Sequence, residues 1–181
     1  MRRLVPTVLV LLIGAGVAVS AAPAASLLAP LSACPGQRDA AAPIASQERA
    51  MRCMHDYARK QAGRARLGRP ASLGRSSSRK SGDILRCDEF SHTACGREFT
   101  YWIRRSGYGG GRCFSAGENI AYGTGPYGTV RSIMRAWLGS NGHRQNILRG
   151  SFSDFGVGLR IGTIDGTPGA RVWTAHFGDR C

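Results

Sequence analysis

The sequence predicts an α+β fold in which the helices come first and the strands come last. Two segments, Glu48 to Ala62 and Thr129 to Leu138, carry apolar residues at the spacing of an amphipathic helix. Two runs with the composition of strands, Phe155 to Ile164 and Arg171 to Phe177, close the chain. The residues between these runs, Asp165 to Gly169, are typical of a hairpin turn. This order of elements favours the α+β class.

The first two predicted helices follow each other directly. The first begins near Ser46, a good N-cap residue. The residues of its inner face are Met51, Met54, Tyr57, Ala58 and Ala62. The second starts at Pro70 and extends to Leu85, although Gly74 and the run Ser76 to Ser78 are weak helix formers.

A third helix is predicted from Ala94 to Arg105, where the run Ser106 to Gly111 breaks it. The triple glycine at the end of that run, Gly109 to Gly111, indicates a turn or a mobile loop, because it lacks the spacing and the following Lys-Ser/Thr of a phosphate-binding loop. The fourth helix, Thr129 to Leu138, has a clear inner face. Its residues are Val130, Ile133, Met134 and Trp137.

The beginning of the chain has the features of a secretory signal peptide, which we assign to residues 1–21. Two arginines precede an apolar run from Leu4 to Val19, and small residues follow. We expect cleavage after Ala21 or Ala24. The alternative is a membrane anchor, but a spanning helix needs about 20 apolar residues, and the run from Leu4 to Val19 is shorter. No second apolar segment of that length follows in the sequence, so we expect the mature chain to be soluble. The signal peptide predicts that it is secreted and extracellular.

Residues 22–46 are rich in Ala, Pro and Ser and are predicted to form a linker, the least ordered part of the mature chain. The folded domain is then assigned to residues 47–181. Cys34 could tether the linker to this domain. The length of the mature chain is that of one domain, and we expect a monomer.

Six cysteines follow the signal peptide, and an even number in an exported protein predicts disulfides. They are Cys34, Cys53, Cys87, Cys95, Cys113 and Cys181. Pairing Cys95 with Cys113, or Cys34 with Cys53, would close short loops. Zinc-thiolate sites and thiol nucleophiles are less favoured, because the spacing lacks paired CxxC ligands and no activating base is adjacent.

The chain is strongly basic, with a formal net charge of +14. This charge falls by two, to about +12, when Arg2 and Arg3 leave with the signal peptide. Outside the cell such a charge favours anionic wall polymers or lipid headgroups as partners. A basic, solvated surface is the simpler alternative. We expect no specific nucleic-acid partner, because the basic residues are spread along the sequence and no known module appears.

Candidate chemistry centres on histidines and one carboxylate. His92, His143 and His176 lie in distinctive segments, whereas His55 looks like an ordinary helix residue. Glu118 lies between small and apolar stretches, where a buried charge needs a partner. Two imidazoles and one carboxylate can hold Zn²⁺ with an open position, or form a hydrogen-bonded cluster without metal. Spacing alone does not decide between these alternatives.

Four motifs in the same order resemble the bacterial branch of the CAP superfamily, which comprises cysteine-rich secretory proteins, antigen 5 and pathogenesis-related 1 proteins. The bacterial members are also called SCP-like extracellular proteins. The resemblance extends from Glu48 to Gly178. The motifs are Phe90-Ser91-His92, Gly117-Glu118-Asn119-Ile120-Ala121, the segment Trp137 to Leu148, and Gly156-Val157-Gly158.

This resemblance implies an α-β-α sandwich with a central antiparallel sheet and a cleft lined by two histidines and two acids. His92 and His143 match the cleft histidines, and Glu118 matches one acid. Ser140 stands where the second acid is expected. The resemblance therefore implies a cleft of His92, Glu118, His143 and Ser140, in which the first three could hold a divalent metal such as Zn²⁺.

The favoured function is that of a secreted module that binds a metal or another ligand. The first alternative is an extracellular hydrolase of peptide or cell-wall substrates, and Ser140 in place of an acid argues against it. The second is a structural protein retained at the wall by its charge, and the intact histidine pair argues against it. The sequence accordingly favours a binding module over an enzyme, with the hydrolase left as an open alternative.

Overall fold

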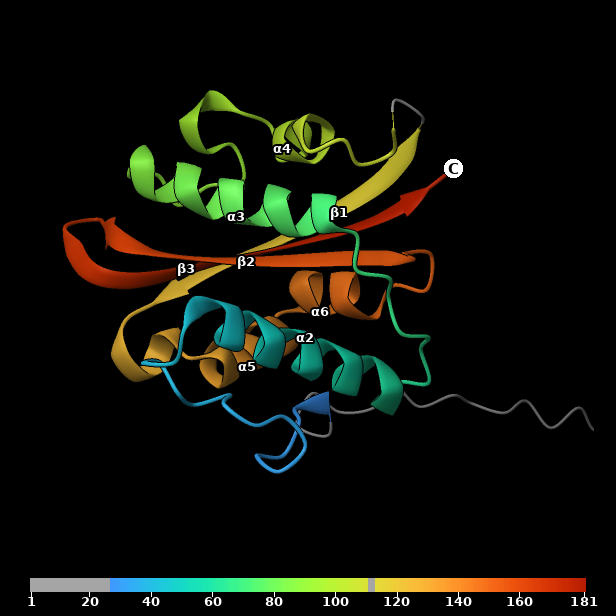
Figure 1. The fold of residues 1–181 in the computed structure, drawn as a ribbon, viewed down its shortest axis with the longest axis horizontal. Coiled ribbons are helices and arrows are strands. Elements are labelled where there is room, and N and C mark those ends of the chain that lie inside the picture. Colours follow the sequence, from blue (N-terminus) through green and yellow to red (C-terminus); the bar gives the residue numbers. More distant parts are fainter. Residues whose placement is uncertain (1–26, 111–112) are drawn as a thin grey trace, which may run out of the picture.

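The computed structural model describes residues 27–110 and 113–181. The chain forms three layers, with helices on both faces of an antiparallel sheet (Figure 1). The predicted α+β class and the α-β-α sandwich are therefore confirmed. The expected signal peptide, residues 1–21, lies outside the described residues.

The central sheet contains β1 (Phe114–Gly123), β2 (Asp154–Ile164) and β3 (Thr167–Arg180) in the order β1-β3-β2. β2 and β3 form the predicted hairpin, and its turn consists of Asp165 and Gly166. Both turn residues have a positive φ, of 48° and 68°, as a tight hairpin turn requires. The expected order is wrong in one respect, because β1 lies in the chain between helices and had not been predicted.

Most of the predicted helices are present, and their bounds differ by a few residues. The helices are α2 (Ile44–Gln61), α3 (Ala71–Arg86), α4 (Thr100–Arg105), α5 (Val130–Gly139) and α6 (Asn141–Leu148), with short 3-10 helices η1 (Ala94–Gly96) and η2 (Gly125–Gly128). The single helix expected over Ala94 to Arg105 is wrong. Cys95 has a φ of 62° and ends η1, so α4 begins only at Thr100.

One face of the sheet is covered by α2, α5 and α6, and the interface between them is apolar (Figure 1). Alternate residues of β3, Trp173, Ala175 and Phe177, point into this interface and are fully buried. Trp137 of α5 and Met54 of α2 meet them from the helical side. This face therefore holds the main hydrophobic core.

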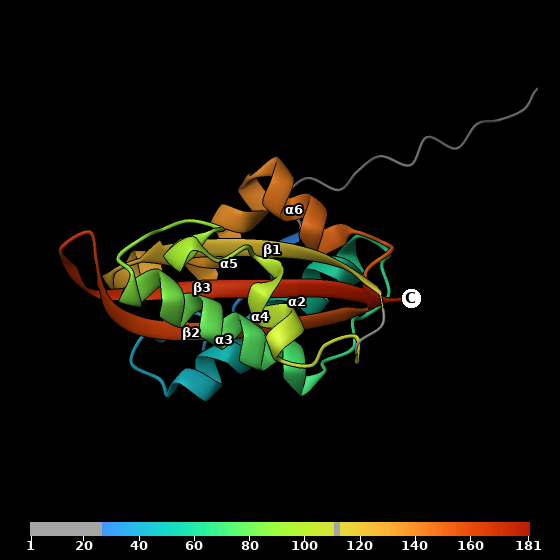
Figure 2. The same ribbon diagram turned by 90° about the horizontal axis from the view of Figure 1, so that it is seen from above.

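The other face of the sheet is covered by α3 and α4 (Figures 1 and 2). Here the backbone of α3 approaches β2 closely, because Gly156 and Gly158 present no side chain to it. A Cβ at Gly156 would overlap the backbone of Leu73 and Gly74, and one at Gly158 would overlap that of Ser78. The motif Gly156-Val157-Gly158 thus seats α3 on the sheet.

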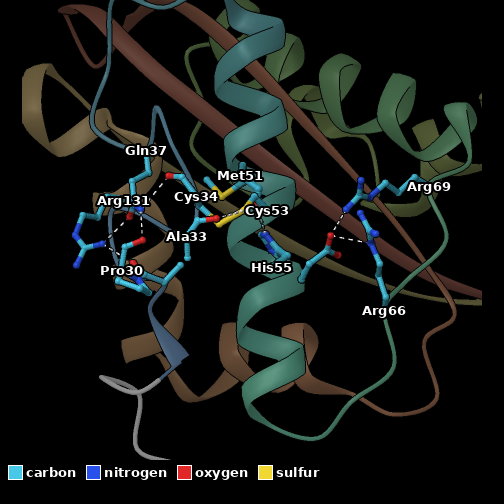
Figure 3. Close-up of a disulfide and its surroundings, with 12 residues drawn as sticks. Pro30, Ala33, Cys34, Gln37, Met51, Cys53, His55, Arg66, Arg69 and Arg131 are labelled. Carbon is cyan, nitrogen blue, oxygen red and sulfur yellow. Dashed lines mark hydrogen bonds and ion pairs between the residues drawn. A yellow bond between two sulfur atoms is a disulfide. The ribbon is translucent and has the colours of Figure 1, made fainter.

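The segment before α2 is packed against the domain, so the prediction of a linker is wrong for residues 27–43. Leu27 and Ala29 are fully buried in the main core. Gln37 is 1 % exposed and donates through Nε2 to Cys34 O at 3.0 Å (Figure 3). Arg131 of α5 donates to Ala29 O at 2.7 Å. These contacts depend on residues distant in sequence, which composition does not show.

All six cysteines lie in the described part of the chain and are paired. Cys34–Cys53, one of the two expected pairs, is confirmed. The alternative Cys95–Cys113 is wrong, because Cys95 pairs with Cys87, and Cys113 pairs with the last residue, Cys181. Among residues 27–110 and 113–181, no helix is long and apolar enough to cross a membrane.

Candidate functional site

Glu118 of β1 lies at the centre of a hydrogen-bonded cluster under α3. It faces His176 across the β1-β3 register, and both side chains point to the α3 face of the sheet. The Glu118 side chain is 2 % exposed. Its Oε1 lies 2.6 Å from His92 Nδ1, and its Oε2 lies 2.7 Å from His176 Nε2. One buried carboxylate thus bridges two imidazoles.

The two imidazoles differ in their exposure. The side chain of His92 is 53 % exposed, whereas that of His176 is fully buried. His92 lies in the loop after α3, and Lys80 of α3 donates to its backbone oxygen at 2.6 Å. Glu118 and Lys80 therefore fix the ring and the backbone of His92, while the rest of the ring remains open to solvent.

Ser76 of α3 extends the cluster inward. Its Oγ lies 2.7 Å from His176 Nδ1 and also donates to Leu73 O at 2.9 Å. Ser76, His176 and Glu118 have the order of a Ser-His-acid triad, but Ser76 and His176 are both fully buried. A substrate cannot reach this hydroxyl in the folded chain, so the contact positions α3 on the sheet.

Glu118 is ionised at neutral pH. Burial alone would raise the pKa of its carboxyl, but hydrogen bonds from His176 and His92 and the charge of Lys80 outweigh burial. The pKa of Glu118 is consequently lowered. Burial also lowers the pKa of Lys80, against the opposing effect of the Glu118, Asp83 and Glu89 charges.

His143 lies in α6, which is held against β1 by two asparagines. Asn119 Nδ2 donates to His143 O at 3.0 Å, and Asn146 Nδ2 donates to Asn119 Oδ1 at 2.9 Å. Partial burial, and then the electrostatic interaction with His92, lower the pKa of the His143 imidazole. His92 is bonded to Glu118 of β1, and the backbone of His143 is bonded to Asn119 of β1, so both residues lie near this edge of the sheet. The lowered pKa keeps His143 neutral at pH 7.

Ser140, expected in the cleft, lies at the junction of two helices. Its backbone N–H donates to Ala136 O at 3.1 Å at the end of α5, and its backbone oxygen accepts from Arg144 N at 2.9 Å at the start of α6. In the described part of the chain, no hydrogen bond joins its hydroxyl to the cluster of His92, Glu118 and His176.

The structure does not present the expected set of three direct metal ligands, His92, Glu118 and His143. Within residues 27–110 and 113–181, no group of three or more His, Cys, Asp or Glu side chains is arranged to hold an ion. Both oxygens of Glu118 instead accept hydrogen bonds from histidines. Only the imidazoles of His92 and His143 remain available, and Glu118 orients one of them.

Sequence reasoning singled out His176 but left it out of the site, and it missed Lys80 and Ser76 altogether. The strand alternation of Arg171 to Phe177 places His176 opposite the apolar face, which was the available signal. Its pairing with Glu118 depends on the register between β1 and β3, which lie 58 residues apart at this point.

The comparisons with known proteins agree with this architecture. The sequence model described as "CAP: Cysteine-rich secretory protein family" matches residues 53–177. The uncharacterized protein YkwD of Bacillus subtilis is 38% identical over 63 residues, which are 35% of this chain and 21% of that protein. The chain thus aligns with about a fifth of this curated relative.

Three solved structures share the fold at low identity. An extracellular protein containing a SCP domain from Bacillus anthracis has a TM-score of 0.62 and 22% identity, over 76% of this chain and 41% of that one. An outer surface protein from Borrelia burgdorferi has a TM-score of 0.64 and 16% identity, over 77% and 97%. A cysteine-rich secretory protein from Staphylococcus aureus has a TM-score of 0.57 and 15% identity, over 77% and 40%.

Proposed function

Because this chain belongs to the cysteine-rich secretory protein (CAP) family, we propose that it is a secreted binding module with its site at the β1 edge, at His92, Glu118 and His143. Three disulfides support an oxidising location. The similar proteins of B. anthracis and S. aureus are described as extracellular and secretory, which also supports it.

The bridge formed by Glu118 is the observation that carries this proposal. When the ionised carboxylate accepts the Nδ1–H of His92, the opposite ring nitrogen, Nε2, keeps its lone pair. The ring is 53 % exposed, so this nitrogen can bind a ligand from solvent. The hydrogen bond to a carboxylate also increases the basicity of the ring. Glu118 accordingly prepares His92 to act as a ligand or hydrogen-bond acceptor.

A divalent ion such as Zn²⁺ would be held by the His92 and His143 rings, with water in its other positions. When bound, it would supply a positive charge that could hold an anionic ligand. Glu118 would orient His92 without contacting the ion. Two protein ligands bind an ion more weakly than three or four, so we expect a reversible site.

A hydrolase is less well supported by the same geometry. A carboxyl group that acts as general acid or base must exchange protons with the substrate, and both oxygens of Glu118 are already engaged by histidines. Ser140 supplies no second acid, and Ser76 is buried. The site therefore supports binding better than hydrolysis.

Calorimetric titration with ZnCl₂ at pH 7.5 and pH 5 tests the metal-binding form of the proposal. We expect binding at pH 7.5, with a loss in acid because protonated imidazole cannot ligate. His143→Ala should abolish binding, Glu118→Gln should weaken it about 10- to 100-fold, and the neighbouring Ser91→Ala should bind like the wild type. Equal binding by wild type and His143→Ala would overturn the metal site.

A further inference from the structure

We infer that a groove along the β2 edge, between α2 and α3, binds a linear polymer that carries repeated phosphate groups. Two hollows, of about 670 and 730 Å³, meet there and share Arg52, Ala71 and Gly74 as lining residues. Since the strand order is β1-β3-β2, this edge is opposite the one that carries Glu118. The groove is thus a second site, independent of the proposed function.

The lining of this groove is strongly basic. Its eight basic residues are Arg49, Arg52, Lys60, Arg66, Arg69, Arg75, Arg79 and Arg160. Two acidic residues, Glu48 and Asp56, accompany them, and eight against two leaves a net charge of +6. The whole chain has 25 basic and 11 acidic residues. The basic residues are therefore spread along the sequence but concentrated in space, and the arrangement attracts anions.

The two acids of the groove are already engaged. Asp56 accepts from Arg66 Nε at 2.8 Å and from Arg69, and Figure 3 shows these two arginines converging from the loop after α2. Glu48 Oε2 lies 3.3 Å from Arg52, and its Oε1 accepts from the backbone N–H of Leu159 at 3.1 Å. Asp56 and Glu48 thus hold neighbouring arginines in place along the groove.

The remaining five basic side chains are exposed, and within the described residues none of them pairs with an acidic side chain. They are Arg49 and Lys60 of α2, Arg75 and Arg79 of α3, and Arg160 of β2. Arg49 donates to Ser46 Oγ at 2.7 Å, and Arg75 donates to Ser106 O at 3.1 Å. These neutral partners leave the positive charges uncompensated.

The spacing of the basic residues favours a ligand with several charges. Arg49 and Lys60 are eleven residues apart on α2, which corresponds to about 16 Å along the helix. Arg75 and Arg79 lie one turn apart on α3, across the groove. A single phosphate could contact the basic residues at one end of the groove only, whereas a chain of phosphates could contact those along its whole length.

The groove also favours phosphates over bases or peptides. Seven of the eight basic residues are arginines, whose guanidinium groups donate two parallel hydrogen bonds to an oxyanion. The aromatic residues of the lining are Tyr57 and Phe155, and Phe155 is buried. Successive bases of a nucleic acid would need several stacking partners. The groove therefore suits a polymer that presents phosphates without bases.

Gly74 provides the sharpest test, because it lines both hollows and a Cβ at this position meets no atom within 4 Å. Gly74→Glu adds a negative charge at the junction, and Gly74→Gln adds the same volume without charge. Both replace a helical glycine, so neither should destabilise α3. With inorganic polyphosphate as probe, we expect Gly74→Glu to bind at least about tenfold more weakly than Gly74→Gln at low salt.

Two fourfold variants separate the groove from the overall charge. The groove variant combines Arg49→Gln, Lys60→Gln, Arg75→Gln and Arg79→Gln. The control variant removes four exposed arginines outside the two hollows, namely Arg38, Arg64, Arg135 and Arg149, also to Gln. Unchanged melting temperatures would verify folding. The groove variant should lose at least about tenfold more affinity than the control, and its affinity should depend less on salt.

Several outcomes would overturn the inference. Equal losses in the two fourfold variants, or equal binding by the two Gly74 variants, would show that the whole surface attracts polyphosphate. Tighter binding of poly-glutamate or of a single-stranded oligonucleotide than of polyphosphate would exclude phosphates as the recognised groups. His143→Ala should retain polyphosphate binding, so failure of this site and failure of the zinc site can be distinguished.

Discussion

The two faces of the sheet are both buried but in different ways. Under α2, α5 and α6, large apolar side chains such as Trp137 and Phe177 fill the space. Under α3, the centre of the interface is polar, and buried side chains there are joined by hydrogen bonds. The polar residues include Ser76, Ser77, Lys80, Ser81, Glu118, Thr174 and His176. The apolar face provides most of the stability, whereas the polar face positions functional groups.

One buried histidine on each face makes the difference clear. His55 of α2 packs against Phe155, with ring centroids 4.3 Å apart, and its Nδ1 bonds to Met51 O. Its Nε2 has no hydrogen-bond partner in the part of the chain that the structure describes. His176 instead has a polar partner at each ring nitrogen. The apolar face thus tolerates a neutral histidine, while the polar face uses its histidine as a link.

The largest expected effect is on the apolar face, at Trp137. This side chain is 1 % exposed and also donates to Ile120 O at 3.2 Å. Trp137→Ala should lower the free energy of unfolding by about 3–5 kcal/mol. The matched variant Trp102→Ala, at a half-buried tryptophan of α4 on the other face, should cost less. Urea denaturation measures both, and an equal or larger cost at Trp102 would contradict the comparison.

The second effect is a pH dependence of the free energy of unfolding, which originates at His55. Burial, followed by the charges of Arg59 and Arg69, lowers its pKa from 6.5 to about 4, although its bond to Met51 acts in the opposite direction. Between these two pH values the unfolded chain binds a proton that the folded chain does not. The contribution of His55 to the free energy of unfolding is therefore fully present above pH 6.5. About 3 kcal/mol of that free energy is lost as the pH falls from 6.5 to 4.

The variant His55→Phe should remove this part of the acid sensitivity. Because other groups also titrate, the informative quantity is the difference between wild type and variant in the free energy of unfolding, measured from pH 7.5 to pH 4. A constant difference across that range would show that His55 is not the source.

The third effect is on the polar face, at Glu118. Glu118→Gln replaces one acceptor oxygen by an NH₂ group that faces a histidine nitrogen, so one buried hydrogen bond is lost. We expect a cost of about 1–3 kcal/mol in the free energy of unfolding. Glu98→Gln, at an exposed acid, serves as the control and should be neutral. A neutral Glu118→Gln would mean that the bridge does not stabilise the polar face.

The smallest effect concerns the serines that join α3 to the sheet. Ser81 Oγ donates to Thr174 Oγ1 at 2.9 Å, and both residues are fully buried. Ser81→Ala should cost about 1 kcal/mol, because the hydroxyl of Thr174 loses its partner. Thermal unfolding of this variant beside Ser78→Ala, at a half-buried position of the same helix, measures the difference.

The sequence predicted the elements whose side chains repeat regularly, namely α2, α3, α5 and the β2-β3 hairpin. β1 was missed because Gly117, Glu118 and Asn119 interrupt any strand pattern. α6 was missed because it contains Gly142 and has a single buried residue, Ile147. Regular burial produces a sequence signal, and these two elements lack it.

The break before α4 depends on contacts between distant residues. Cys95 pairs with Cys87, and Asp83 of α3 accepts hydrogen bonds from Arg97 and from Trp102 of α4. None of these pairings follows from local propensity. The packing of the segment before α2 has the same origin, because it depends on the disulfide to Cys53.

The candidate site was predicted in a different way. His92, Glu118 and His143 came from a resemblance of motifs, because residues up to 51 positions apart carry no local signal for a shared site. The structure joins His92 to Glu118 and adds His176, Lys80 and Ser76. The role of Glu118 as an acceptor for two histidines required the register of β1 on β3.

The state of the His92 ring tests the central claim most directly, since Glu118 is proposed to fix it. Long-range ¹H–¹⁵N NMR of the histidine rings at pH 7.5 distinguishes a protonated Nδ1 from a protonated Nε2. We predict that His92 carries its proton on Nδ1, that ZnCl₂ shifts its Nε2 signal, and that Glu118→Gln abolishes this preference. A proton on Nε2 of His92 in the wild type, or an unchanged ring in Glu118→Gln, would contradict the account.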